Sequence, residues 1–169
     1  MITEIIIFLA VTIALFGAVF IINAIINRLL KKKLTVSEDL EKSISINIIK
    51  SLLFVSVAIL INEVNISLHS ISKIIEVNNT GGGLMFQSLS YFSIFIFIIF
   101  LTFSFIFILA YIMFSVIFKG KDILIEAVNN NYGLVIFFIG IFTSLLFTVK
   151  SNMLPIFEYF IQYPTISIH

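Results

Sequence analysis

Residues 92–110 read FSIFIFIIFLTFSFIFILA, a run without charge, proline or glycine. Its length matches the roughly 20 residues that a helix needs to cross about 30 Å of hydrocarbon. Strands of a membrane barrel would alternate polar and apolar side chains over about ten residues, and no such alternation is present in this run. The run therefore predicts a transmembrane helix, and it decides the fold class for the rest of the chain.

Windows of the same kind recur along the sequence. Residues 5–27, 46–62, 86–118 and 131–149 contain no charged residue except Lys50. The chain of 169 residues is 60% hydrophobic and 11% charged, with a mean hydropathy of +1.20, whereas soluble domains are about half apolar and a quarter charged. We therefore expect an all-α integral membrane protein with four transmembrane helices embedded in the lipid bilayer.

Several kinds of site are excluded by the residue types. Cysteine is absent, which removes disulfides, thiolate catalysis, iron–sulfur clusters and thiolate-bound zinc. His69 and His169 are too few for a histidine-rich metal site, and a net charge of +1 offers no basic surface for nucleic acid. The sequence shows neither a serine-histidine-acid arrangement nor paired carboxylates at membrane level. We expect no enzyme and no cofactor.

The distribution of lysine and arginine predicts the orientation, because short loops with an excess of basic residues face the cytoplasm. One side of the membrane carries Arg28, Lys31, Lys32, Lys33, Lys42, Lys50, Lys119 and Lys121, and the other carries Lys73 and Lys150. We therefore expect a multi-pass protein of the bacterial inner (cytoplasmic) membrane, with two cytoplasmic linkers and both termini extracytoplasmic.

The first linker has the pattern of a helix start. Thr35 precedes Glu38 by three residues, which is the capping-box spacing. Glu38, Asp39 and Glu41 place negative charge in the turns where the helix dipole favours it. The second helix is expected to begin near residue 36. The three acids and Lys42 form a candidate partner-binding segment.

The outer side is expected to hold residues 67–85, an amphipathic segment followed by a turn. Val64, Leu68, Ile71 and Ile75 recur at helical spacing among polar residues, which predicts a short helix on the outer surface. The sequence NNTGGG at 78–83 tolerates positive φ and predicts the turn.

Residues 151–169 are expected to form an extracytoplasmic tail. They contain Phe157, Tyr159, Phe160 and Tyr163, and aromatic rings prefer the headgroup level of a membrane. Among the ionisable residues near the bilayer, Lys50 can snorkel to the cytoplasmic surface, while Glu63 and Lys150 both fall near the outer surface. These two are expected to form an interfacial ion pair.

An internal repeat is suggested by DLEKSISINIIKSLLFVSVAIL at 39–60 and ILIEAVNNNYGLVIFFIGIFTSLL at 123–146. Aligning Asn47 with Asn131 places an acidic lead-in before each asparagine and an apolar helix after it. The chain then consists of two tandem helical hairpins, residues 1–66 and 86–150. Because each hairpin crosses twice, the two are parallel repeats about an axis along the membrane normal.

This arrangement resembles the bacterial inner-membrane family called domain of unknown function 350, the YjfL-like proteins. The resemblance covers about residues 5–152 and rests on Asn47 and Asn131, each of which follows an acidic segment. The family usually has glycine before this asparagine and a small residue after it, whereas Ile48 and Tyr132 follow here. Because the family has no established activity, the resemblance implies an architecture and leaves the function open.

The stretch EAVNNNYGLV at 126–135 places three asparagines before the last membrane window. Asparagine is among the best N-cap residues, so a structural role at the helix start is expected for Asn129, Asn130 and Asn131. The alternative is a polar entrance lined by Asn23, Asn47 and Asn131.

Small residues recur at a spacing that lets membrane helices approach closely. The candidate packing residues are Ala10, Ala14, Gly17 and Ala18 in the first window, and Gly140 and Ser144 in the last. The helix that packs on them can belong to the same chain or to a neighbouring copy, and we expect a homo-oligomer.

Two functions remain open. The first is a non-enzymatic anchoring or signalling subunit that contacts a cytoplasmic protein partner through residues 28–50. The second is an oligomeric pore or carrier for ions or small solutes, including a stress or phage-defence membrane effector, which would use Asn23, Asn47 and Asn131.

Overall fold

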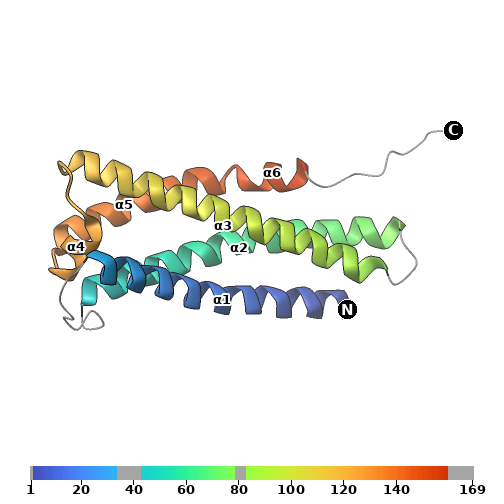
Figure 1. Ribbon diagram of the computed structural model, residues 1–169. Coiled ribbons are helices and arrows are strands. Elements are labelled where there is room, and N and C mark those ends of the chain that lie inside the picture. The colour runs from blue at the N-terminus through green and yellow to red at the C-terminus, as the bar shows by residue number, and fades with distance from the viewer. Residues whose placement is uncertain (1, 34–42, 79–82, 160–169) are drawn as a thin grey trace.

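The computed structural model describes residues 2–33, 43–78 and 83–159 of the chain. Every regular element in these residues is a helix: α1 (Ile2–Lys33), α2 (Ile44–Asn78), α3 (Gly83–Ile117), α4 (Ile123–Val128), α5 (Tyr132–Lys150) and α6 (Met153–Tyr159). The long helices α1, α2, α3 and α5 run alternately in opposite directions (Figure 1). One end of the bundle holds the last turn of α1, the first turn of α2 and the short α4, and we name it the α4 end.

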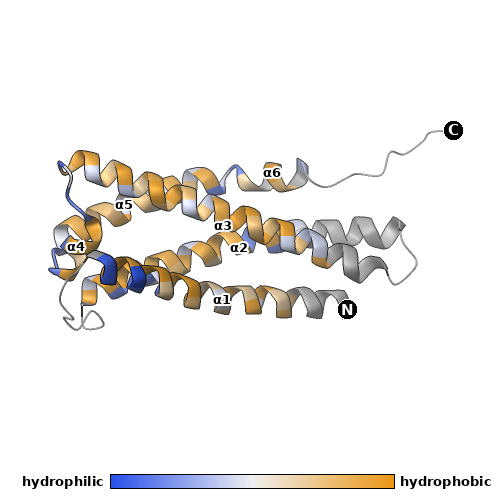
Figure 2. Cartoon of the chain, in the orientation of Figure 1, coloured by the Kyte–Doolittle hydropathy of each residue, from blue (hydrophilic) through white to orange (hydrophobic). Residues whose placement is uncertain are grey.

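The four long helices contain stretches that are long and apolar enough to cross a membrane: Phe8–Lys32, Ile44–Ser67, Leu89–Ile117 and Tyr132–Lys150. The predicted all-α class with four membrane helices is therefore confirmed for the described part of the chain. Apolar residues predominate along the coloured parts of the long helices, and strongly hydrophilic residues gather at the α4 end (Figure 2).

The outer surface of the bundle is suited to lipid. Phe8, Ile13, Phe16 and Phe20 of α1 are each at least 66% exposed. Exposed apolar side chains of this size would be costly in water, but they cost nothing against acyl chains of the same polarity. The bundle therefore carries apolar residues both inside and outside along its membrane spans.

The interior is filled by aromatic and branched side chains. Phe114, Phe138 and Phe142 are fully buried between α3 and α5. The ring centroids of Phe114 and Phe138 are 5.9 Å apart with planes at 84°, an edge-to-face arrangement that favours the quadrupoles of both rings. These contacts join α3 to α5.

Helices α2 and α3 are longer than a bilayer is thick. Each has 35 residues, which gives a length of about 52 Å at 1.5 Å per residue. The hydrocarbon core is only about 30 Å thick, so part of each helix lies outside it.

One sequence expectation takes a different form in the structure, and two others lie outside the described residues. The amphipathic residues after Glu63 do not begin a new helix, because α2 continues without a break to Asn78. The helix start expected near residue 36 and the turn at 79–82 lie outside the described residues. The described part of α2 begins at Ile44, where the hydroxyl of Ser43 accepts a weak hydrogen bond from the Ile46 amide at 3.4 Å.

Candidate functional site

The α4 end holds most of the polar contacts between helices, and its construction starts at the end of α3. Lys119 and Gly120 both have positive φ, 55° and 84°. The Gly120 amide donates to the Ser115 carbonyl at 2.7 Å, the long-range bond of a Schellman motif. This motif stops α3 sharply and redirects the chain towards α4.

Helix α4, which sequence reasoning did not separate from the last membrane helix, is fixed to α3 through one carboxylate. Asp122 Oδ1 accepts the Leu124 amide at 2.9 Å as the N-cap. Asp122 Oδ2 accepts the Tyr111 hydroxyl at 2.8 Å. The sequence signal for α4 is an N-capping aspartate seven residues before an asparagine run, and a six-residue helix is too short for periodicity to reveal.

The three asparagines form the turn between α4 and α5. Asn129 is the C-cap of α4, and Asn130 has a φ of 52°, a left-handed conformation that asparagine tolerates better than most residues. The amide of Asn131 donates to the Glu126 carbonyl at 2.9 Å, and that of Asn130 to Ala127 at 3.0 Å. Together these bonds make a second Schellman motif.

The predicted capping role of Asn131 is right in position and wrong in chemistry. Asn131 is the N-cap residue of α5, but its side chain makes no capping hydrogen bond. Its Nδ2 instead donates to Glu126 Oε2 at 2.9 Å, and Lys121 Nζ lies 3.4 Å from Glu126 Oε1. Glu126 therefore holds the two ends of the α4 segment together.

Ser43 connects the start of α2 to this turn. Its side chain is 7% exposed, and its Oγ lies 2.8 Å from the Ala127 carbonyl oxygen and 3.2 Å from Asn130 Oδ1. A hydroxyl has one proton, so these two acceptors share it. The residue that follows segment 34–42 is thereby fixed to α4.

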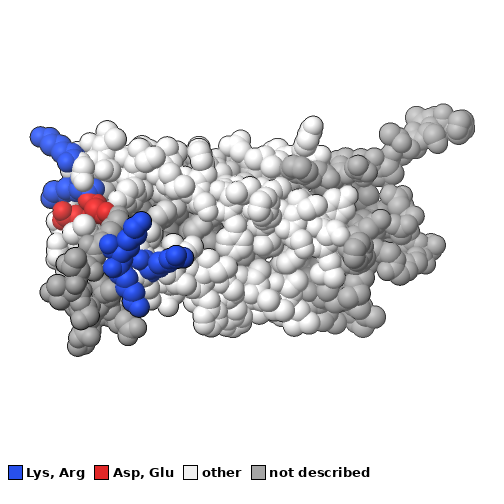
Figure 3. All heavy atoms as spheres, in the orientation of Figure 1, with Lys and Arg blue, Asp and Glu red and all other residues white. Residues whose placement is uncertain are grey.

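Basic side chains gather at the α4 end (Figure 3). Arg28, Lys31 and Lys32 at the end of α1 are exposed, as are Lys119 and Lys121. Lys50, which was predicted to snorkel, donates from Nζ to Asn27 Oδ1 at 2.9 Å. The lysine thus joins α2 to α1.

The predicted polar entrance consists of residues at different depths. Asn23 and Asn47 are both exposed, and Asn131 is half-buried. At 1.5 Å per residue, Asn23 lies about 15 Å from the end of α1 and Asn47 about 5 Å from the start of α2. Their convergence on one entrance stays a prediction.

The bundle interior has few polar groups that could line a passage. The buried polar or charged residues of the described chain are Ser43, Ser45, Ser56, Glu63 and Ser67. The hydroxyls of Ser56 and Ser67 donate to carbonyls four residues earlier in α2, a local bond that faces no passage. Buried polar groups are therefore few within the described residues.

The candidate packing residues of α1 face into the chain itself. Ala18 is fully buried, and Ala10, Ala14 and Gly17 are half-buried. A methyl group built on Gly17 would meet no atom within 4 Å, so of these residues it is the buried Ala18, and not Gly17, that lies where α1 packs on the rest of the bundle.

The packing residues of α5 face outward instead. Gly140 and Ser144 are exposed, and the Ser144 hydroxyl donates to the Gly140 carbonyl at 2.9 Å. A methyl group built on Gly140 would meet no atom within 4 Å. This face is not used for packing within the described chain.

The opposite end carries the ion pair that the sequence predicted. Lys150 Nζ lies 3.2 Å from Glu63 Oε1, with the two side chains 34% and 12% exposed. The pair joins α5 to α2 just before α6, whose Phe157 is buried against Phe95 with ring centroids 4.6 Å apart. The start of the predicted aromatic tail is therefore helical and packed onto the bundle.

One of the predicted sites receives no geometry from the structure. Glu38, Asp39, Glu41 and Lys42, the candidate partner-binding residues, lie outside the described residues. Within residues 2–33, 43–78 and 83–159, no group of three metal-ligating side chains comes together. Comparison of the chain with protein-family models, curated proteins and solved structures found no match.

Proposed function

We propose that this protein is a non-enzymatic anchoring or signalling subunit of the membrane, which contacts a cytoplasmic protein through residues 28–50. The observation that carries the proposal is the pair of hydrogen bonds from the Ser43 hydroxyl to the Ala127 carbonyl and to Asn130 Oδ1. Segment 34–42 starts from the end of α1 and ends on a residue fixed to α4. A partner that binds the charged residues of this segment is therefore attached, through Ser43, to α2 and α4, and through them to the other helices of the bundle.

The distribution of polarity supports this function over a passage through a single chain. The interior between the described helices is mainly apolar, and the hydrogen bonds of Ser43, Asp122 and Glu126 lie at one end. A solute pathway needs polar groups at successive depths. An anchoring subunit needs only a stable bundle and polar residues at the end that contacts its partner.

We further propose that the chain is built from two parallel hairpins, α1 with α2 and α3 with α5, as in the domain of unknown function 350 family. The support is that both hairpins turn at the α4 end (Figure 1). The excess of basic residues at this end supports its cytoplasmic location in a bacterial inner membrane. The outward small residues of α5, Gly140 and Ser144, support a homo-oligomer.

The test is purification of the protein from native membranes in a gentle detergent, followed by native mass measurement. We expect one soluble protein at a fixed stoichiometry, lost when Glu38, Asp39, Glu41 and Lys42 are replaced by Gln, Asn, Gln and Gln. The matched control is Lys119→Gln with Lys121→Gln, which changes charge on the other linker. A well-folded protein without a companion, or equal loss in the control, contradicts the proposal.

The alternative function is an oligomeric pore or carrier, including a stress or phage-defence effector. The observation that favours it is the exposure of Asn23 within the membrane span of α1, because a polar side chain facing lipid gains a partner when copies assemble. It predicts solute flux through reconstituted protein that Asn23→Leu, or Asn47→Leu with Asn131→Leu, reduces. A folded oligomer without flux contradicts it.

A further inference from the structure

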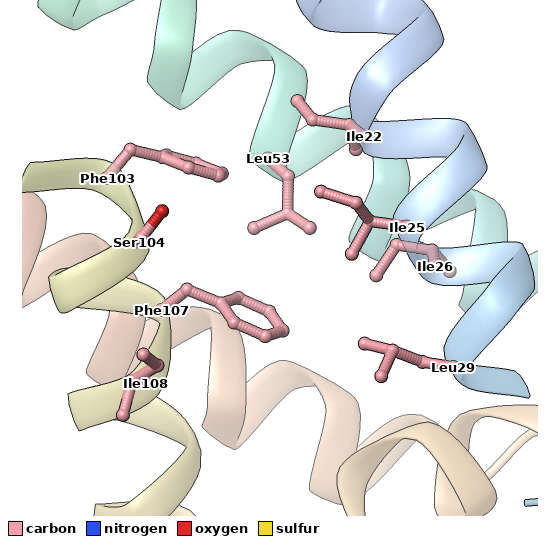
Figure 4. Close-up of a pocket in the computed structure, with 9 residues that line it drawn as sticks. All are labelled: Ile22, Ile25, Ile26, Leu29, Leu53, Phe103, Ser104, Phe107 and Ile108. Atoms are coloured by element: carbon pink, nitrogen blue, oxygen red, sulfur yellow. The ribbon is translucent and has the colours of Figure 1, made fainter. Parts of the chain in front are cut away.

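A groove opens between α1 and α3, with α2 as its back wall. Its cavity volume is about 260 Å³. Ile22, Ile25 and Leu29 of α1 face Phe103 and Phe107 of α3 across it, and a leucine of α2 lies behind them (Figure 4). The groove lies within the membrane spans of both helices, so the molecules that surround it are lipids.

The walls of the groove suit a hydrocarbon chain. The one polar side chain in the lining is Ser104, whose hydroxyl proton is already donated to the Phe100 carbonyl at 2.7 Å. Ile25 and Ile108 at its rim are 50% and 56% exposed, so the groove is open to the side. An acyl chain can enter laterally and make close contacts with both helices.

The groove continues towards two cations. Arg28 lies three residues after Ile25, and Lys32 lies three residues after Leu29, so both lie beside the lining face of α1 near the α4 end. Both side chains are exposed. Arg28 is level with the Leu29 end of the groove and Lys32 lies about one helical turn beyond it, where the phosphate of a lipid would lie if its acyl chain filled the groove.

The acids described at the same end are engaged within the protein. Asp122 accepts the Tyr111 hydroxyl and the Leu124 amide. Glu126 accepts Asn131 and pairs with Lys121. The charge of Glu126 is therefore offset by Lys121, whereas Asp122 keeps its negative charge because both of its donors are neutral.

We propose that this groove binds one acyl chain of an anionic phospholipid, whose headgroup is held by Arg28 and Lys32. Basic residues at the ends of membrane helices bind anionic headgroups, and a guanidinium group matches the geometry of a phosphate. The apolar groove supplies the second part of the recognition, because it favours a lipid over a free anion. The inference is independent of any partner protein and of which leaflet faces the cytoplasm.

The test is native mass spectrometry of the full chain, titrated with phosphatidylglycerol or with phosphatidylcholine of the same acyl chains. We expect one bound phosphatidylglycerol per chain and a preference over phosphatidylcholine. Arg28→Gln with Lys32→Gln should reduce this preference roughly fivefold for each cation removed. Lys119→Gln with Lys121→Gln makes the same charge change at the same end and should leave it unchanged.

A second pair of variants tests the groove itself. Ser104→Phe fills it and should remove the bound lipid. Ser144→Phe is the matched control, because Ser144 is also an exposed membrane serine bonded to a carbonyl four residues earlier. The proposal is overturned if both lipids bind equally, or if variant and control lose the lipid equally. It is also overturned if the protein is a dimer that Ser104→Phe alone dissociates, because the groove would then hold a second copy of the chain. Elution of all variants as single folded species excludes misfolding as the cause.

Discussion

Replacement of Asn130 tests how the α4 end is constructed. This residue holds a φ of 52° and accepts the Ser43 hydroxyl at 3.2 Å. Asn130→Gly removes the hydrogen bond but adopts the left-handed conformation freely. Asn130→Ala removes the same bond and also brings a Cβ into a conformation that is unfavourable for L residues.

The magnitudes follow from these two contributions. The lost hydrogen bond costs about 1 kcal/mol net, and the left-handed conformation costs alanine about 1 kcal/mol more. We therefore expect the free energy of unfolding to fall by about 1 kcal/mol in Asn130→Gly and about 2 kcal/mol in Asn130→Ala. Asn129→Ala is the matched control. Asn129 is exposed with a φ of −74°, so we expect a change within about 0.5 kcal/mol.

The assay is unfolding in mixed micelles with increasing SDS, followed by circular dichroism. A second measurement on Ser43→Ala, alone and combined with Asn130→Gly, gives the coupling energy of the pair. If Asn130→Ala is no less stable than Asn130→Gly, the left-handed turn is not part of the folded protein. If the two substitutions at 43 and 130 are additive, the hydrogen bond between Ser43 and Asn130 is refuted.

Three further predictions concern the opposite end and the topology. Lys150→Met should lower the free energy of unfolding by about 1–2 kcal/mol, less than for a fully buried pair because the Lys150 side chain is a third exposed. Adding Glu63→Gln should restore part of this loss, and a further fall in the double variant would contradict the ion pair. Phe157→Ala, which empties a fully buried site, should cost about 3 kcal/mol in the same unfolding assay, and an unchanged midpoint would show that α6 is not docked. Because the chain has no cysteine, Ser151→Cys should react with a membrane-impermeant maleimide in intact cells and Lys119→Cys only after permeabilisation; the reverse pattern would invert the proposed orientation.

Polar residues were the part of the site that sequence reasoning predicted least well. It expected Asn131 to cap α5, and the residue is at that position, yet its amide binds Glu126 instead. The choice of Asn130 as the left-handed residue depends on where α4 ends, and α4 is too short to leave a periodic pattern. The Glu63–Lys150 pair was predicted correctly, because depth along two helices of known length can be counted in residues.

The sequence by itself determined that four helices are long and apolar enough to cross a membrane, because this property depends on the summed transfer free energy of each apolar window and needs no knowledge of neighbours. Only the tertiary structure decided which faces of these helices meet. Lipid tails are as apolar as the side chains of the core, so Phe103 on α3 and Phe16 on α1 look alike in sequence although one lines a groove and the other is 66% exposed. The groove between α1 and α3, the inward packing of Ala18 and the attachment of Ser43 to α4 join residues from helices far apart in the chain. Such contacts depend on how the helices pack, and hydrophobicity that is equal on every face of a helix carries no information about that.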